Sequence, residues 1–254
     1  RRSSDLVCNP TFSMYKIYGA LCGARVWEYD LDSGFDLDLD GFTGGLRKER
    51  PKLVFLCNPN NPTGKGIELP EIEEVLKNTG GIVVADEAYF EFSGVTAADL
   101  LPKYDNLIIL RTFSKAFGLA GLGYMLACPA IISYIDRVRS PFNVNVFAQA
   151  AAAEVLKNLD KVAERIEIIK SERERLSALL SELKGLQCFK SRSNFILIRS
   201  AYLAEIRNKL GEEGIFIRNF SNPALENCLR VTVGSRHSND KFYEAVKEVL
   251  YERA

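Results

Sequence analysis

The sequence predicts an α/β fold, because short apolar runs typical of buried strands alternate with segments of helical pattern. Three of these runs, at residues 53–57, 82–85 and 107–110, are each followed directly by polar residues. In an open α/β sheet, ligands bind beyond the carboxyl ends of the strands. We therefore expect the polar residues after these strands to meet in one crevice, although they are far apart in the chain.

Lys115 is the residue around which this crevice is expected to form. It follows the run at 107–110, in a loop of small residues that extends to Gly121. In such a loop the amine can be desolvated, which disfavours the ammonium form, and the neutral amine attacks carbonyl groups. A solvated surface lysine is the alternative, and a Ser-Lys pair alone is too common to decide between the two.

Polar residues after the two upstream strands favour the first interpretation. Asn61 follows the run at 53–57, and Asp86 and Tyr89 follow the run at 82–85. An amide, a carboxylate and a phenol beside an amine suit pyridoxal 5'-phosphate, which needs an anion at its pyridinium nitrogen and a lysine at its aldehyde. Glu87 is an alternative acid or base. It is less favoured, because neighbouring residues of a strand point to opposite faces of the sheet.

Three motifs carry a resemblance to a known family. They are Asn-Pro-Asn-Asn-Pro-Thr-Gly at 58–64, Ala-Asp-Glu-Ala-Tyr at 85–89 and Thr-Phe-Ser-Lys-Ala-Phe-Gly-Leu-Ala-Gly at 112–121. In this order they resemble the fold-type I aminotransferases that depend on pyridoxal 5'-phosphate, and most closely the histidinol-phosphate aminotransferases. The resemblance implies a mostly parallel sheet sandwiched by helices, in a large domain at residues 1–165. It also implies a small α+β C-terminal domain at residues 166–254.

The resemblance also assigns roles in cofactor binding. Lys115 would bind the aldehyde, Asp86 would pair with the pyridinium nitrogen, and both would act in catalysis with Tyr89. Phe12 would stack on the ring, although a core phenylalanine is the alternative. The full set of expected cofactor contacts is Phe12, Asn61, Asp86, Tyr89, Thr112, Ser114 and Lys115.

The C-terminal segment at 228–236 resembles the signature of the family that binds the anionic group of the substrate. Arg230 matches the arginine of that signature, and a guanidinium recognises a carboxylate or phosphate through two hydrogen bonds. An arginine on the wet edge of a strand is the alternative. Arg236 is a second candidate, and Asn194 also lies at a family position near the substrate.

The chain departs from the family pattern in two places. Leu122 is followed directly by Gly123, so the arginine that pairs with the cofactor phosphate in the family is missing. The chain also begins at a point that lies inside the large domain of the family, without the segment that helps to hold that phosphate. We expect from this a cofactor-free site, with a break or a strained connection between Leu122 and Gly123.

Composition narrows the classes of partner. Lys+Arg and Asp+Glu both number 33, which gives no support for nucleic acid or an anionic membrane. The six cysteines show no C-x-x-C pair, and His237 is the lone histidine, so neither a metal site nor a His-dependent triad is expected. Scattered thiols favour a reducing cytoplasm. No apolar run is long enough to span a bilayer, and no signal peptide is visible.

The activity implied by the resemblance is transfer of an amino group between a small-molecule donor and a 2-oxo acid, by a cytoplasmic homodimer. The specific expectation is conversion of histidinol phosphate and 2-oxoglutarate to imidazole acetol phosphate and glutamate, in histidine biosynthesis. Three alternatives stay open: a lyase like threonine-phosphate decarboxylase, an aromatic aminotransferase, and a truncated homologue without activity.

Overall fold

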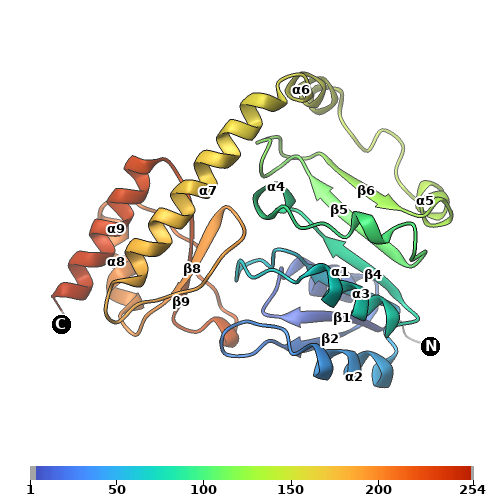
Figure 1. The fold of residues 1–254 in the computed structure, drawn as a ribbon, viewed down its shortest axis with the longest axis horizontal. Coiled ribbons are helices and arrows are strands. Elements are labelled where there is room, and N and C mark those ends of the chain that lie inside the picture. Colours follow the sequence, from blue (N-terminus) through green and yellow to red (C-terminus); the bar gives the residue numbers. More distant parts are fainter. Residues whose placement is uncertain (1–3, 253–254) are drawn as a thin grey trace.

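The computed structural model describes residues 4–252, which form two β-sheets with helices around them (Figure 1). The larger sheet has six strands in the order β2-β1-β3-β4-β5-β6. Strands β1 to β5 are parallel, and β6 pairs with β5 in the antiparallel direction. The expected mostly parallel sheet is therefore confirmed. Its strands are β1 (Ser4–Asn9), β2 (Arg25–Asp30), β3 (Leu53–Cys57), β4 (Ile82–Asp86), β5 (Leu107–Thr112) and β6 (Gly123–Ala127).

Helices cover both faces of this sheet because its strands are apolar on both faces. Alternate residues such as Leu6 and Val54 pack against Phe42 of helix α2 and Ile72 of helix α3. On the opposite face, Tyr15 of α1 packs among Val7, Phe55 and Cys57. The helices of this part are α1 (Met14–Leu21), α2 (Leu39–Glu49), α3 (Leu69–Lys77), α4 (Phe90–Ser93), the 3-10 turn at Ala98–Leu100, α5 (Pro129–Asp136) and α6 (Val146–Leu156).

The C-terminal part is built on a three-stranded antiparallel sheet in the order β7-β8-β9. Leu180 of α7, Ile206 of α8 and Phe242 of α9 pack together on one face of it. This is the expected α+β unit, and the predicted boundary at residues 165–166 falls inside α7. The elements are α7 (Leu159–Ser181), β7 (Gln187–Cys188), β8 (Phe195–Arg199), α8 (Leu203–Glu212), the 3-10 turn at Pro223–Leu225, β9 (Cys228–Thr232) and α9 (Arg236–Tyr251).

The segment 215–218 has the alternating pattern of a strand but does not form one. Of its residues only Arg218 pairs, through an isolated bridge to Arg230. The two residues exchange backbone hydrogen bonds of 3.1 and 3.2 Å. Ile215 and Ile217 still pack against the core, and this inward alternation explains the strand-like pattern of the sequence.

The connection between Leu122 and Gly123 is neither broken nor strained, so the expectation about it is wrong. The chain turns back after β5 and enters β6 in regular antiparallel pairing, with Thr112 opposite Gly123. The backbone N–H of Phe113 donates to the carbonyl of Leu122 at 2.9 Å. The reversal places Gly121 at a φ of +85°, which glycine adopts without the clash that a Cβ would cause.

Among residues 4–252, no helix combines the length and the apolar character that a membrane span requires.

Candidate active site

A cleft of about 730 Å³ lies where the loops after β1, β3, β4 and β5 meet the C-terminal part. Its walls bring together five of the residues that the sequence singled out: Phe12, Asn61, Tyr89, Lys115 and Arg230. They come from positions up to 218 apart in the chain. The fold therefore brings residues that follow different strands together at one crevice, as expected for an open α/β sheet. Arg218 also lines the cleft and was missed as a site residue.

Lys115 stands in the loop after β5, with its Nζ 5.5 Å from the centre of the Tyr89 ring. The side chain is exposed to the open cleft. The expectation that the protein itself desolvates this amine is therefore not met. The physical reason is that the loop presents Lys115 toward the cleft rather than into the core beneath the sheet.

Asp86 ends β4 and lies on the α1 face of the sheet, behind the cleft lining. Its Oδ2 accepts a 2.5 Å hydrogen bond from the hydroxyl of Tyr15, and its Oδ1 accepts from the backbone N–H of Ala88 at 3.1 Å. Burial raises the pKa of the Asp86 carboxyl, while these two donors and the nearby charge of Lys115 act in the opposite direction. The carboxylate keeps lone pairs free for a further donor.

Glu87 points to the other face, as the alternation of strand residues requires. Its side chain is fully buried, with Arg111 at 2.9 Å, the hydroxyl of Thr96 at 2.9 Å and the N–H of Ala97 at 2.6 Å. All of these partners belong to the scaffold. Glu87 is therefore a structural anchor and takes no part in the cleft.

Tyr89 forms part of the cleft wall nearest the C-terminal part. Its ring meets Phe195 edge-on, with centroids 5.2 Å apart, and burial raises the pKa of its phenol to about 12. The hydroxyl therefore keeps its proton at neutral pH and is a hydrogen-bond donor.

Asn61 and Arg230 join the two parts of the molecule across the cleft. The Nη1 of Arg230 donates to Oδ1 of Asn61 at 2.5 Å, which leaves the amide NH₂ of Asn61 free to donate. Among the described residues, the buried Nε of Arg230 finds no acceptor. The guanidinium lies 4.8 Å over the Phe195 ring, and burial lowers its pKa. An anionic group in the cleft would supply what the Nε lacks.

The other predicted contacts lie outside the cleft lining. The hydroxyls of Thr112 and Ser114 hydrogen-bond each other at 2.9 Å, beside the Lys115 loop. Asn194 accepts a backbone hydrogen bond from Val233 at 2.9 Å. Arg236 is the first residue of α9 and is exposed. The hydrogen bond from Arg175 is the main cause that lowers the pKa of Glu172, and the charge of Arg236 adds a smaller effect. The structure does not bring Arg236 to the cleft.

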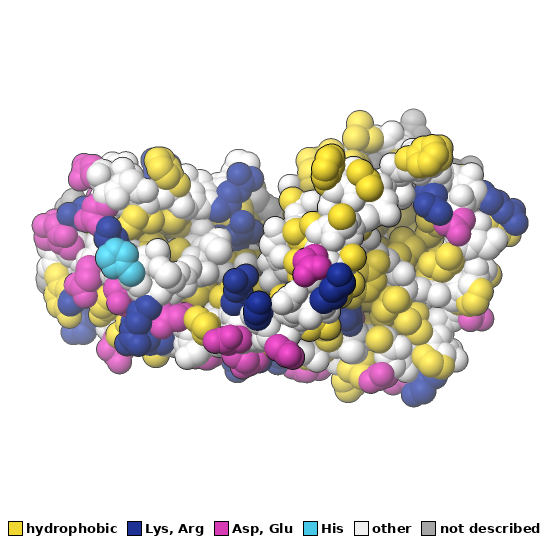
Figure 2. All heavy atoms as spheres, turned by 90° about the horizontal axis from the view of Figure 1, so that it is seen from above, with side chains coloured by type: hydrophobic (Ala, Val, Ile, Leu, Met, Phe, Trp, Pro, Cys, Tyr) yellow, Lys and Arg dark blue, Asp and Glu magenta, His cyan; other side chains and the backbone are white. Residues whose placement is uncertain are grey.

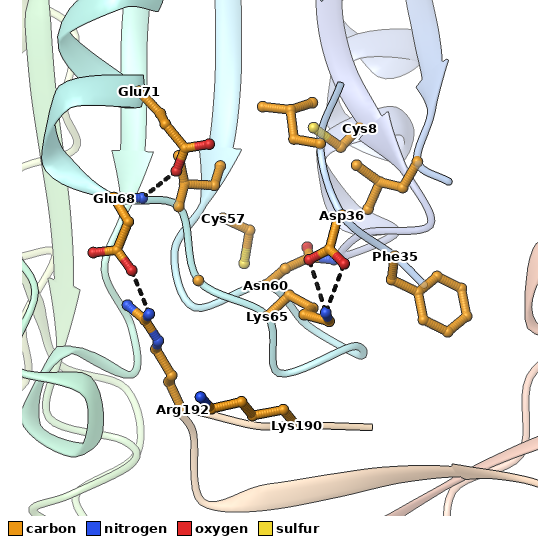
Figure 3. A pocket seen from close by; sticks show the side chains of 14 residues that line it. Cys8, Phe35, Asp36, Cys57, Asn60, Lys65, Glu68, Glu71, Lys190 and Arg192 are labelled. Atoms are coloured by element: carbon orange, nitrogen blue, oxygen red, sulfur yellow. Dashed lines mark hydrogen bonds and ion pairs between the residues drawn. The ribbon is translucent and has the colours of Figure 1, made fainter. Parts of the chain in front are cut away.

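A second, smaller pocket of about 310 Å³ lies on the other side of the loop that carries Asn61, and ion pairs in its wall hold that loop (Figure 3). There the Nζ of Lys65 pairs with Asp36 at 2.7 Å, and Arg192 pairs with Glu68 (Figure 3). The charges that line this pocket are thus largely matched by one another. In the part of the chain that the structure describes, no group of three or more His, Cys, Asp or Glu side chains could hold a metal ion.

A close backbone contact ties the same loop to the C-terminal part. The N–H of Arg192 donates to the carbonyl of Gly64 at 2.8 Å. Gly64 has a φ of +75°, and a Cβ there would lie 2.3 Å from the hydroxyl oxygen of Ser191. Only glycine fits both constraints, so the last residue of the 58–64 motif is explained by packing.

Comparison with known proteins identifies the class to which this cleft belongs. The chain matches the family "aminotransferase class I and II" over residues 4–249. It belongs to the class I and II aminotransferase family. It is accordingly an enzyme of the kind that depends on pyridoxal 5'-phosphate, as the motifs predicted.

Three similar proteins show how far the likeness extends. A histidinol-phosphate aminotransferase of Thermoanaerobacter pseudethanolicus is 44% identical over 245 residues, which are 95% of this chain and 70% of that protein. The crystal structure of the histidinol-phosphate aminotransferase from Clostridium acetobutylicum matches with a TM-score of 0.91 at 27% identity, over 99% of this chain and 79% of that one. The Sinorhizobium meliloti enzyme, solved in complex with pyridoxal-5'-phosphate, matches with a TM-score of 0.89 at 27% identity, over 100% and 72%.

The residues present fit this cofactor. The set offers a carboxylate with free lone pairs, an accessible lysine amine and the half-exposed ring of Phe12 at the cleft wall. It also offers the free donors of Asn61 and Tyr89. These groups match the ring nitrogen, the aldehyde, one ring face and the phenolic oxygen of the cofactor.

We expect Asp86→Asn to raise the free energy of unfolding at pH 8. The folded pKa of Asp86 lies above its ordinary value of 3.8, because burial disfavours the carboxylate. Between the two pKa values the folded state binds more protons than the unfolded chain, so stability falls as pH rises through the folded pKa. The gain in the variant should be largest above that pKa and should shrink as pH falls toward 3.8.

Urea unfolding at a series of pH values measures this difference. Asp105→Asn is the matched control, because it makes the same chemical change at an exposed aspartate outside the cleft. It should leave the free energy of unfolding within about 0.5 kcal/mol of the wild-type value at every pH. An equal gain from Asp86→Asn at pH 8 and at pH 4 would contradict the assigned cause.

Proposed function

We propose that the protein is a histidinol-phosphate aminotransferase, which converts histidinol phosphate and 2-oxoglutarate to imidazole acetol phosphate and glutamate. The observation that carries the proposal is the single cleft with a lysine amine on one wall and two guanidinium groups, of Arg218 and Arg230, on another. The relatives named above support the choice of substrate. The activity would serve histidine biosynthesis.

The cofactor site is proposed from the side chains that face the cleft or lie behind it. When bound, pyridoxal 5'-phosphate supplies an aldehyde that condenses with amines and a ring that accepts an electron pair. Asp86 would keep the ring nitrogen protonated, and Phe12 would cover one face of the ring. The free amide NH₂ of Asn61 and the protonated phenol of Tyr89 would donate to the phenolic oxygen. Thr112 and Ser114 would complete the site through their hydroxyls.

Lys115 is proposed to move the proton of the reaction. Its Nζ is exposed in the cleft and close to the Tyr89 ring, so it can reach a bound molecule without a change of the backbone. As a neutral amine it would take a proton from the carbon that bears the amino group and return it on the other side of the transfer. Tyr89 would keep the site polar at the same end of the cleft.

The substrate anion is proposed to bind at Arg230 and Arg218. Two guanidinium groups that line one cleft recognise a phosphate better than a neutral group, because each offers a planar fork of charged donors. Burial of Arg230 strengthens this preference, since its Nε is withdrawn from water without an acceptor. Asn194 and Arg236 are retained as secondary candidates on the sequence resemblance alone.

We expect Lys115→Ala to abolish labelling of the protein by pyridoxal 5'-phosphate and borohydride. The reason is that the labelled bond requires the Nζ of Lys115, the lysine that lines this cleft. Peptide mapping by mass spectrometry locates the label. Lys157→Ala, at the exposed lysine that caps the C-terminus of α6, serves as control and should label as the wild type does. Equal labelling of the Lys115→Ala protein at the same peptide would make the assignment wrong.

A product assay tests the reaction itself. With histidinol phosphate and 2-oxoglutarate, we expect glutamate and imidazole acetol phosphate in equal amounts, without carbon dioxide. Carbon dioxide released from an amino-acid phosphate without exchange of a 2-oxo acid would favour the lyase instead. Faster turnover of phenylalanine or tyrosine would favour an aromatic aminotransferase. Absence of all three activities, with Lys115 unlabelled, would identify an inactive homologue.

A homodimer is proposed from exposed apolar side chains, and a cytoplasmic location from the free cysteines. Figure 2 shows hydrophobic side chains gathered over the part that carries α5 and α6. Within residues 134–147 they include Tyr134, Val138, Phe142 and Phe147, which are 68–98% exposed. Exposed apolar side chains gathered in one region are typical of a protein interface. The six cysteines, all within the described residues, are free thiols, which suits a reducing compartment.

We expect Phe147→Asp to shift the protein from dimer to monomer. The side chain is 84% exposed in the single chain, so a charge there costs little in the monomer but would be buried in a dimer. Sedimentation equilibrium measures the change. Phe216→Asp is the control, because Phe216 is 93% exposed but lies in the C-terminal part. A wild-type protein that is monomeric at micromolar concentration would refute the dimer.

A further inference from the structure

Tyr15 contacts two of the proposed cofactor residues at once. It is buried in the first turn of α1, and its hydroxyl donates to Oδ2 of Asp86 at 2.5 Å. Its ring and that of Phe12 are nearly perpendicular, with centroids 5.5 Å apart and planes at 87°. The Tyr15 ring also stacks on Phe55 of β3, with centroids 4.9 Å apart and planes at 16°. Tyr15 thus links helix α1 to strand β3 and contacts both Asp86 and Phe12.

We propose that Tyr15 is a positioning residue that sets both Asp86 and Phe12 for the cofactor ring. The inference rests on the proposed function, which makes Asp86 the partner of the ring nitrogen and Phe12 the cover of the ring face. Tyr15 itself does not line the cleft, so it acts through these two residues. Its hydroxyl orients Asp86 through a hydrogen bond, and its ring supports Phe12 through an aromatic contact.

The hydroxyl fixes the plane of the Asp86 carboxylate. Each oxygen of Asp86 accepts from one donor, Oδ2 from Tyr15 and Oδ1 from the backbone of Ala88. Two donors on different oxygens hold the rotation of the carboxylate, whereas Ala88 alone would leave it free to turn. Loss of the Tyr15 hydroxyl would therefore misalign the lone pair that meets the ring nitrogen.

The same hydrogen bond decides where the proton resides. Burial and the neighbouring Asp86 raise the pKa of the Tyr15 phenol well above its ordinary value, so Tyr15 remains the donor. Burial raises the pKa of Asp86, and the Tyr15 hydroxyl is the largest opposing influence, ahead of the Ala88 N–H and the charge of Lys115. The thiol of Cys57, also close by, stays protonated, because burial raises its pKa to about 12. Removing the hydroxyl would thus favour a neutral Asp86.

Tyr15→Phe separates these effects from packing, because it keeps the ring and removes only the hydroxyl. Tyr29→Phe is the matched control. Tyr29 also donates to an aspartate, Asp38, at 3.1 Å and also meets a phenylalanine edge-on, Phe42 at 5.2 Å. That pair lies at the start of α2, outside the cleft. A purely structural role for a tyrosine–aspartate hydrogen bond would affect both variants alike.

The first measurement uses the protein after removal of the cofactor. Infrared spectra over a pH series follow the carboxyl band of Asp86, which is assigned by its loss in Asp86→Asn. In Tyr15→Phe the band should titrate at higher pH than in the wild type, whereas Tyr29→Phe should leave the midpoint unchanged. An unchanged midpoint in Tyr15→Phe would overturn the proposal for Asp86, whatever the reaction of the enzyme.

The second measurement uses the loaded enzyme. Tyr15→Phe should lower kcat about tenfold to a hundredfold, as expected when a charge-assisted hydrogen bond to a catalytic carboxylate is lost, and should leave KM for the amino donor nearly unchanged. Lys115 should still be labelled, which separates this result from a failure of the proposed function. Wild-type kcat in Tyr15→Phe, or an equal loss in Tyr29→Phe, would overturn the proposal.

A third variant tests the contact with Phe12. Tyr15→Leu removes the ring as well as the hydroxyl, so Phe12 loses the surface that it meets edge-on. Cofactor release, followed by its absorbance after gel filtration, should be faster in Tyr15→Leu than in Tyr15→Phe. Equal release from the two variants would limit the role of Tyr15 to Asp86 and overturn the part that concerns Phe12.

Discussion

The buried ion pair between Glu87 and Arg111 is the interaction on which the geometry of the site depends. It joins the end of β4 to the end of β5, and the N–H of Glu87 also donates to the carbonyl of Leu110 at 2.8 Å. The Arg111 guanidinium lies 3.5 Å over the Phe90 ring. A buried pair of this kind tolerates little displacement, because removing either partner leaves an uncompensated charge. Asp86 immediately precedes Glu87, and Lys115 follows Arg111 by four residues. The ion pair therefore sets the separation between Asp86 and Lys115.

Contacts between the two sheets set the opposite wall of the cleft. Within the larger part, the loop with Asn61 is held by its own Asn60, whose side-chain NH₂ donates to the carbonyl of Pro10 at 2.9 Å. It is held from the side by the backbone contact between Gly64 and Arg192. The C-terminal part reaches the cleft itself through the segment 218–222 and through Leu225 and Arg230. The cleft exists because both sheets contribute residues to it.

The sequence was sufficient to predict those features that are encoded locally. The apolar runs predicted the strands, and the alternation along β4 placed Glu87 away from the cleft. The three motifs identified the family. The helix that starts at Leu39 is harder to predict, because the run before it is acidic and contains its N-cap, Asp38.

Features that depend on distant pairing could not be read in this way. Arg218 enters the cleft because it pairs with Arg230, and nothing in its own neighbourhood indicates this. Tyr15 looks like any aromatic residue on an apolar helix face, since its partner Asp86 is 71 positions away. The exposure of Lys115 depends on the path of the loop after β5. The missing arginine suggested a damaged connection, whereas the register of β5 and β6 absorbs it without strain.

The unmatched Nε of Arg230 has a consequence for discrimination between ligands. A neutral molecule with the shape of the substrate would seal this guanidinium from water and give its Nε no acceptor. Such an unmet donor costs about 1–3 kcal/mol, more for a charged group, so rejection of the neutral molecule would be about tenfold or greater. The cleft would therefore discriminate against a neutral ligand because that ligand leaves the Nε of Arg230 without a hydrogen-bond acceptor. Because the same guanidinium also donates to Asn61, the penalty would extend to the position of the Asn61 side chain.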